Sequence, residues 1–324
     1  MASTICRPSK NYSKWAKVAN KKKAVKRKAR LWLEGARLRT LPLAVAPVAI
    51  GAGAAASIQS FDATLTLLAL AVALFLQIGV NYANDYSDGI RGTDAKRVGP
   101  LRLTGSNSVK PAAVKRAAFA FFFLAAAAGL AIVLITQIWW LLAVGLVAIV
   151  AAWFYTGGKS PYGYAALGEL SVFLFFGIVA TVGTAYIQID NFEQNSLVVM
   201  VSFVGATAIG LFSAAVLMVN NIRDIDLDRH VSKNTLAVKV GKRAAKAIYF
   251  AFIWIPLVLL SGFVLLYPAT FFAFVSILFV APATLIVATA KQPKELILAL
   301  KLTSFGALAY ALLLGYGLAA VSVG

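Results

Sequence analysis

Nine apolar segments of about 20 residues each dominate the sequence, and in a helix this length crosses roughly 30 Å of hydrocarbon. With 60% hydrophobic and 13% charged residues, the chain has too few polar side chains to cover a single soluble core. The segments lack strand-like alternation, which favours an all-α polytopic membrane protein over a barrel. They lie near residues 41–60, 63–83, 113–136, 138–157, 166–188, 197–219, 244–265, 268–290 and 298–320.

The basic residues test this count independently. All 31 Lys and Arg residues precede the first segment or lie in or beside the loops that follow segments two, four, six and eight. The opposite loops carry Asp62, Asp190 and Glu193 instead. Because Lys and Arg are retained in cytoplasmic loops, we expect nine transmembrane helices with the N-terminus in the cytoplasm and the C-terminus outside. The expected location is the cell membrane, with the lipid bilayer as a partner.

The first 30 residues form a basic tail with eleven Lys or Arg and no acidic residue. It lacks the apolar middle of a signal peptide. We expect residues 1–35 to be a disordered cytoplasmic tail on anionic lipid, followed by one membrane domain over residues 36–324. Nucleic-acid binding is an alternative interpretation of such a tail, but no folded nucleic-acid-binding module accompanies it, so we expect no nucleic acid partner.

An acidic motif, NYANDYSDGIRGTD at residues 81–94, follows the second apolar segment. If that segment continues as a helix, Asn81, Asp85 and Asp88 share one face, because they are spaced i, i+4 and i+7. Ionisable side chains next to lipid are costly and usually functional. We therefore expect this motif to form part of a polar site at the membrane surface.

A second acidic motif, NNIRDIDLDRH at residues 220–230, ends the sixth segment. Asn220, Asp224 and Asp228 stand at i, i+4 and i+8, and Asn220 and Asp224 repeat the spacing of Asn81 and Asp85. Both motifs end even-numbered segments, so the expected topology places them on the same side of the membrane. This pairing is typical of an internal structural repeat.

Facing carboxylates repel each other unless a cation lies between them. Oxygen ligands suit Mg²⁺, which shares its coordination shell with phosphates, whereas a single Cys and a single His exclude a Cys/His zinc site. Guanidinium and ammonium groups that bind phosphate flank both motifs. A diphosphate beside apolar helices indicates a polyprenyl diphosphate, whose ionisation gives an allylic cation that aromatic walls stabilise. These basic residues are Arg91, Lys96, Arg97, Arg102, Arg223, Arg229 and Lys233.

At the level of these motifs the chain resembles the UbiA superfamily of intramembrane prenyltransferases, and within it the branch that prenylates 1,4-dihydroxy-2-naphthoate in menaquinone biosynthesis, in an actinobacterial form. The resemblance implies the UbiA-type fold of nine helices around a central cavity and a Mg²⁺-dependent transferase. Polyprenyl diphosphate and 1,4-dihydroxy-2-naphthoate would be its substrates, and demethylmenaquinol its product. The stretches that carry it are ARLRTLPLAVAPV (36–48), NYANDYSDGIRGTD (81–94), GPLRLTGSNSV (99–109), YTGGKSPYGYAALGEL (155–170) and NNIRDIDLDRHVSKNTLAVKVG (220–241).

The resemblance also implies roles for individual residues. Four aspartates would ligate Mg²⁺ and serve catalysis: Asp85, Asp88, Asp224 and Asp228. Four asparagines would support these sites: Asn81, Asn84, Asn220 and Asn221. Asp94 would join the polar site, and five basic residues would bind the diphosphate or the acceptor carboxylate: Arg91, Lys96, Arg97, Arg102 and Lys233. Each of these basic residues also has an alternative role as a topological determinant.

Several candidates near the fourth cytoplasmic boundary stay open. Tyr155, Tyr162 and Tyr164 either line the acceptor pocket or form an aromatic interface belt. Glu169 stands just inside the fifth segment, where an unpaired acid is costly, and is a candidate for the polar site. Lys159 either contacts substrate or only anchors the topology.

Two other functions share these features. A sister prenyltransferase acting on 4-hydroxybenzoate or homogentisate would keep the aspartates and change the acceptor pocket. An ion or phosphate transporter also contains repeats and buried acids, but it would place the acids near the bilayer midplane. The sequence leaves open the length of the prenyl chain, the number of metal ions and the oligomeric state.

Overall fold

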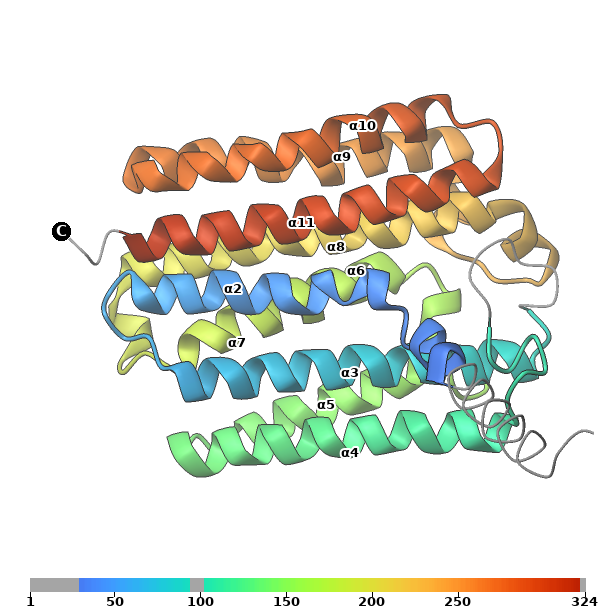
Figure 1. The fold of residues 1–324 in the computed structure, drawn as a ribbon, viewed down its shortest axis with the longest axis horizontal. Coiled ribbons are helices and arrows are strands. Elements are labelled where there is room, and N and C mark those ends of the chain that lie inside the picture. The colour runs from blue at the N-terminus through green and yellow to red at the C-terminus, as the bar shows by residue number, and fades with distance from the viewer. Residues whose placement is uncertain (1–28, 94–101, 321–324) are drawn as a thin grey trace, which may run out of the picture.

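The computed structural model describes residues 29–93 and 102–320, and these form a bundle of helices that lie side by side and alternate in direction (Figure 1). No strand occurs among the described residues, which confirms the all-α prediction. The main helices are α2 (Pro42–Ala56), α3 (Ala63–Ile90), α4 (Pro111–Thr136), α5 (Leu141–Phe154), α6 (Gly168–Val172), α7 (Ala180–Tyr186), α8 (Ser196–His230), α9 (Leu236–Leu266), α10 (Ile277–Thr289) and α11 (Leu296–Ala319). A π-helix over Phe173–Val179 joins α6 to α7.

Each of the nine predicted apolar segments coincides with a helix or a run of consecutive helical elements. Within the described ranges, seven helices are long and apolar enough to cross a membrane. An eighth span results if Ala29–Thr40 and Pro42–Ala56, which meet at a bend of 48°, count as one. The remaining apolar helix, α5, has only 14 residues. The chain is thus a multi-pass membrane protein, and its described part contains seven or eight spans of full length.

The basic tail expected over residues 1–35 lies largely outside the described residues. The described chain is already helical at Ala29, ahead of the expected domain boundary. From there it turns through Arg37, whose φ of 54° is left-handed, into α2. Residues 37–40 therefore form the bend that joins the first described helical residues to α2.

Local sequence signals explain where several helices begin. The Asp62 side chain accepts a 2.8 Å hydrogen bond from the backbone amide of Leu65 and so caps α3. The Asn195 side chain caps α8 in the same way. Proline at the first position of α2 and of α4 is favourable because the amide it lacks would be unpaired there.

The helix α2 lies near the centre of the bundle, against both α11 and α8 (Figure 1). A Cβ atom added to Gly53 would lie 2.5 Å from the Cα of Gly315. Only glycines allow this approach of α2 to α11, as small residues do in many membrane helix pairs. The largest cluster of buried apolar residues draws on α2, α8, α9 and α11.

The helices α3 and α8 carry the two acidic motifs at their C-terminal ends. They are 28 and 35 residues long, so both exceed the length needed to cross the hydrocarbon core. Both run in the same direction, so their C-terminal ends meet at one end of the bundle (Figure 1). Asn81, Asp85 and Asp88 lie within α3, and Asn220, Asp224 and Asp228 lie within α8, so the helical continuation assumed for their spacing is present.

Candidate active site

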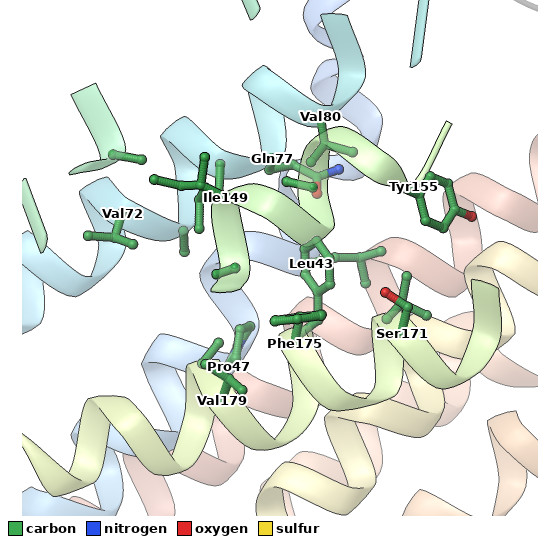
Figure 2. A pocket seen from close by; sticks show the side chains of 18 of the residues that line it. Leu43, Pro47, Val72, Gln77, Val80, Ile149, Tyr155, Ser171, Phe175 and Val179 are labelled. Atoms are coloured by element: carbon green, nitrogen blue, oxygen red, sulfur yellow. The ribbon is translucent and has the colours of Figure 1, made fainter. Parts of the chain in front are cut away.

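A cavity of about 740 Å³ opens between α2, α3, α5 and the segment from α6 to α7 (Figure 2). Most of its wall is apolar. Leu43 and Pro47 contribute from α2, Val72 from α3, and Ile149 from α5. The π-helix turns Phe175 toward the same space, and irregular helical turns of this kind often occur at functional sites. The cavity is suited to a long apolar ligand.

The polar end of the cavity combines residues of both acidic motifs. Its lining there includes predicted site residues from α3, α8 and the loops beside them. Two predicted tyrosines of the loop between α5 and α6 also line it. The predicted residues in the lining are Asn81, Asn84, Asp88, Arg102, Tyr155, Tyr162, Asn220, Asn221 and Lys233. A ligand in this cavity can therefore contact side chains from both halves of the bundle.

In the first motif, Asp85 and Asp88 are only 1% and 3% exposed. The Asp85 carboxylate accepts hydrogen bonds of 2.8 Å from the backbone amides of Leu103 and Thr104. Such bonds to a carboxylate are charge-assisted and offset part of the cost of burial. They tie the segment that leads into α4 to the first motif.

The amides of the first motif are also held by protein contacts. Asn81 donates from Nδ2 to the carbonyl of Ala36, 2.9 Å away, and the Asn84 side-chain oxygen accepts a 2.7 Å bond from the Thr156 hydroxyl. Asn84 thereby joins α3 to the loop that follows α5. These contacts fix which way each amide faces.

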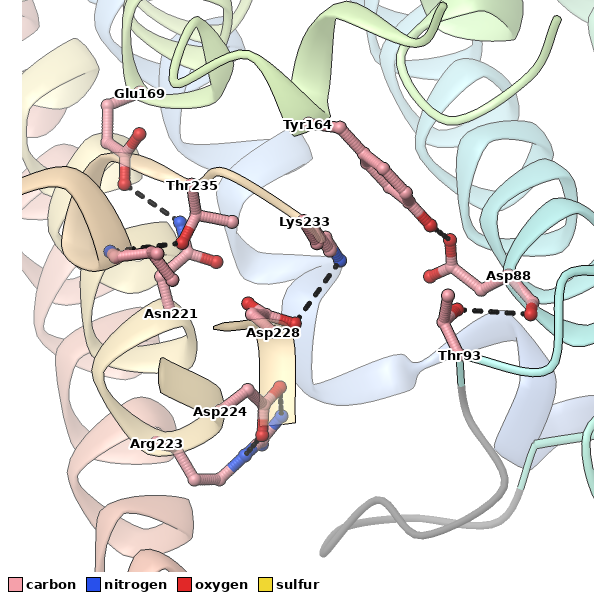
Figure 3. Close-up of polar contacts among 11 residues, drawn as sticks. Asp88, Thr93, Tyr164, Glu169, Asn221, Arg223, Asp224, Asp228, Lys233 and Thr235 are labelled. Carbon is pink, nitrogen blue, oxygen red and sulfur yellow. Dashed lines mark hydrogen bonds and ion pairs between the residues drawn. The ribbon is translucent and has the colours of Figure 1, made fainter. Parts of the chain in front are cut away.

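In the second motif, Asp224 and Asp228 are each 5% exposed. Arg223 donates from Nε and Nη2 to the two Asp224 oxygens, at 2.7 and 2.6 Å (Figure 3). Asp228 lies 4.0 Å from the Lys233 ammonium. Asp226 is exposed, as its position on the helix predicts.

Tyr164 connects the two motifs (Figure 3). Its hydroxyl donates a 2.7 Å hydrogen bond to Asp88, and the Lys233 ammonium lies 5.0 Å from the centre of its ring. Burial and then the Asp88 carboxylate raise the pKa of Tyr164 above its ordinary value, so the hydroxyl stays protonated and can donate. The sequence left Tyr164 open between the acceptor pocket and an interface belt. The structure places it against Asp88 but not among the residues that line the cavity.

Arg91 joins α3 to the loop between α5 and α6. Its guanidinium donates to the carbonyls of Thr156 and Gly158, and its Cζ lies 5.4 Å from the centre of the Tyr164 ring. Lys159, in the same loop, is exposed and is not among the cavity-lining residues. Asp94, Lys96 and Arg97 lie outside the described residues.

Glu169 lies behind the cavity wall and is 4% exposed. Its Oε1 accepts a 2.9 Å bond from the Asn221 amide, whereas its buried Oε2 has no hydrogen-bond partner among the described residues. Tyr162 donates to the carbonyl of Ala151 at 2.8 Å and lies 3.1 Å from the Ser171 hydroxyl. Glu169 is therefore connected to the cavity by its hydrogen bond with Asn221, which lines it.

Sequence reasoning missed several other cavity residues. Arg37, Arg39 and Thr40 line the polar end, and the Gln77 amide donates to the Thr40 hydroxyl at 3.0 Å. The stretch ARLRT, just before the first apolar segment, was the available signal. It was not singled out, because basic residues at that place also serve as topological determinants.

The donor chemistry of the site fits Mg²⁺, since four buried carboxylates and neighbouring amide oxygens are hard ligands. Among the described residues, no three carboxylate, histidine or cysteine side chains are close enough to bind one ion together. Asp85, Asp88, Asp224 and Asp228 instead each contact a donor of the protein.

Comparison with known proteins agrees with this geometry. Residues 44–304 match the model of the UbiA prenyltransferase family. The chain is 46% identical over 218 residues to the 1,4-dihydroxy-2-naphthoate octaprenyltransferase of Mycobacterium tuberculosis, covering 67% of this chain and 72% of the relative. It is 36% identical over 238 residues to the Escherichia coli protein of the same name, covering 72% and 75%.

A solved structure supports the fold. A UbiA homolog from Archaeoglobus fulgidus, bound to GPP and Mg²⁺, superposes with a TM-score of 0.62 at 15% identity, covering 90% of this chain and all of the homolog. At this identity the likeness concerns the fold alone. The family match and the relatives of higher identity are sufficient for assignment: the chain belongs to the UbiA prenyltransferase family.

Proposed function

We propose that the chain transfers a polyprenyl group from polyprenyl diphosphate to 1,4-dihydroxy-2-naphthoate, with loss of CO₂ and diphosphate, giving demethylmenaquinol for menaquinone biosynthesis. The observation that carries this proposal is the cavity, which has residues of both acidic motifs at one end and an apolar wall beyond them. The relatives named 1,4-dihydroxy-2-naphthoate octaprenyltransferase support the choice of acceptor.

Asp85, Asp88, Asp224 and Asp228 would hold Mg²⁺. When bound, the metal would neutralise the diphosphate and make it a better leaving group. Lys233 and Arg102 line the same end of the cavity and would bind phosphate oxygens or the acceptor carboxylate. Solved homologs with GPP and with DMAPP, both with Mg²⁺, support this assignment for the family fold.

The proposed reaction balances without an external oxidant or base. The allylic C–O bond breaks, and its electron pair leaves with the diphosphate. The ring carbon that bears the carboxylate then attacks the allylic cation, and the carboxylate leaves that carbon as CO₂ while its bonding electron pair restores the aromatic ring. The protein holds the two substrates together and excludes water from the cation, for which the apolar wall with Phe175 is suited.

The prenyl tail would lie along the apolar wall. The lining residues of α3 extend from Asp88 back to Ala69, about 28 Å at a rise of 1.5 Å per residue. An extended chain advances about 3.3–3.6 Å per three bonds, so a four-bond isoprene unit spans about 4.5 Å. The cavity wall therefore accommodates about six units.

The same proposal includes the membrane arrangement. We place nine spans in the cell membrane, with the short α5 as one of them, the N-terminus and the polar end of the cavity on the cytoplasmic side, and the C-terminus outside. Basic residues in the loops at the same end of the bundle as the two acidic motifs support this orientation, including Lys110, Arg229 and Lys294.

An acceptor panel tests the reaction. Purified protein in nanodiscs would receive a long-chain polyprenyl diphosphate, Mg²⁺ and either carboxyl-labelled 1,4-dihydroxy-2-naphthoate, 4-hydroxybenzoate or homogentisate. We expect prenylated naphthoquinol and stoichiometric labelled CO₂ from the first acceptor only. A prenylated benzenoid product instead would overturn the assigned acceptor, and no prenylated product with any acceptor would overturn the proposed reaction.

A further inference from the structure

Tyr164 lies between the two acidic motifs and contacts Asp88 on one side and Lys233 on the other. It ends the short 3₁₀ turn Tyr162–Tyr164 in the loop between α5 and α6, and its side chain extends toward α3 (Figure 3). The hydroxyl donates to Oδ1 of Asp88 at 2.7 Å. Because Asp88 is buried, this bond selects one orientation of its carboxylate.

Two cations lie near the same ring. The Lys233 ammonium is 5.0 Å from the ring centre and the Arg91 Cζ is 5.4 Å from it. Like charges close together repel, whereas the face of an aromatic ring attracts cations within about 6 Å. The ring therefore makes it favourable for both cations to stay beside the acidic motifs.

These contacts form a continuous path from α3 to α8. Asp88 bonds the Tyr164 hydroxyl, the ring faces Lys233, and Lys233 lies 4.0 Å from Asp228 (Figure 3). Asp88 and Lys233 line the cavity, but Tyr164 is not among the lining residues. Any effect of Tyr164 on a ligand thus passes through those neighbours.

We propose that Tyr164 is a positioning residue, which sets the Asp88 carboxylate for the metal through its hydroxyl and sets Lys233 for the donor diphosphate through its ring. This inference rests on the proposed function for the identity of the ligand. It assigns two separable contributions to one side chain. Removing the hydroxyl alone and removing the whole ring therefore have different consequences.

The two contributions can be separated by binding measurements that need no turnover. The probe is a radiolabelled S-thiolo analogue of geranylgeranyl diphosphate, titrated into protein in nanodiscs at limiting and at saturating Mg²⁺. For Tyr164→Phe we expect the Mg²⁺ concentration at half-maximal binding to rise about tenfold, with binding at saturating Mg²⁺ within about twofold of wild type. For Tyr164→Leu we expect, in addition, about fivefold weaker binding at saturating Mg²⁺.

Two further variants make the test specific. Tyr249→Phe also loses a buried hydroxyl bond, to Thr303, but Tyr249 does not line the cavity, so neither binding quantity should change. In a double-variant cycle, Tyr164→Leu and Lys233→Gln should be less than additive, because the ring acts through Lys233.

Several results would overturn the proposal. These are wild-type binding by both Tyr164 variants, equal losses in both that follow a drop in thermal stability, or full additivity with Lys233→Gln. Wild-type protein that binds the probe with Mg²⁺ but makes no prenylated naphthoquinol would contradict the proposed acceptor. The split between the two Tyr164 variants would still decide the role of Tyr164.

Discussion

The backbone amide of Leu103 lies 2.8 Å from the carboxylate of Asp85, although 18 residues separate the two in the sequence. Thr104 donates to the other oxygen of the same carboxylate at the same distance. The segment leading into α4 is therefore fastened to a residue that we propose as a metal ligand. Substitutions that shift that segment should therefore displace the Asp85 carboxylate and alter the site.

Gly89→Ala tests this connection. A Cβ atom at residue 89 would lie 2.5 Å from the Cβ and Cγ2 atoms of Thr104, so Thr104 must move away from Asp85. We expect kcat/KM to fall about tenfold, because overpacking of this kind costs about 1–3 kcal/mol. Gly262→Ala is the matched control, since nothing lies within 4 Å of its added Cβ and Gly262 does not line the cavity. Equal rates for the two variants would show that the Thr104 contact does not matter for activity.

Arg223→Gln tests how the second motif is stabilised without metal. Arg223 bonds both oxygens of Asp224, and both side chains are at most 5% exposed. Removing one partner of such a buried pair should lower the free energy of unfolding in EDTA by about 3 kcal/mol. Mg²⁺ should reduce this loss if it takes over the carboxylate. Chemical unfolding in detergent measures both values.

The exposed Arg229 provides the control for that experiment. Arg229→Gln should change the free energy of unfolding by less than about 0.5 kcal/mol, as surface substitutions usually do. A loss at Arg223 that is the same with and without Mg²⁺ would argue against Asp224 as a ligand.

Gly177→Ala tests the contact that holds the π-helix against α8. A Cβ atom at residue 177 would lie 2.6 Å from the carbonyl oxygen of Ala206 and 2.7 Å from the Cα of Gly210. Backbone atoms cannot give way as side chains do, so we expect destabilisation of about 2 kcal/mol and a lower midpoint in thermal unfolding. Gly183→Ala, with nothing within 4 Å, should keep the midpoint of wild type or raise it. A smaller drop in the unfolding midpoint for Gly177→Ala than for Gly183→Ala would show that the π-helix and α8 can move apart at little cost.

Cysteine labelling tests the orientation. In a Cys6→Ser background, Gln194→Cys lies in the loop between α7 and α8, and Lys294→Cys lies in the loop between α10 and α11; both residues are exposed. A maleimide that cannot cross the membrane should label only Gln194→Cys in intact cells, and both variants after permeabilisation. The reverse pattern would contradict the cytoplasmic placement of the site.

Much of the fold follows from the sequence because membrane spans and helical spacing obey simple rules. Span length and composition predicted the helical segments, and the i, i+4 spacing of Asn81 and Asp85 predicted a shared face provided that the second segment continues as a helix, as α3 does. The shortness of α5 was not predictable in this way, because its apolar segment is longer than the helix of 14 residues that forms within it. The π-helix Phe173–Val179 was not predictable either, because periodicity does not distinguish its wider turns from those of a regular apolar helix.

The candidate site was less predictable from the sequence. Residue type and spacing led to Asp88 and Lys233, and the structure places both at the cavity, although their roles remain predictions. The backbone amides of Leu103 and Thr104 leave no side-chain signal. Tyr164 resembled any tyrosine at a membrane boundary until its contact with Asp88 was known.

The central claim is that both acidic motifs act on one polyprenyl diphosphate with Mg²⁺. The most direct measurement is prenyl transfer to 1,4-dihydroxy-2-naphthoate by purified protein in nanodiscs, comparing wild type with Asp85→Asn and Asp224→Asn, each folded as judged by thermal unfolding. We predict prenylated naphthoquinol from wild type, abolished by EDTA and restored by Mg²⁺, with at least about a 100-fold loss in each variant. Full activity in EDTA, or in either variant, would contradict the account.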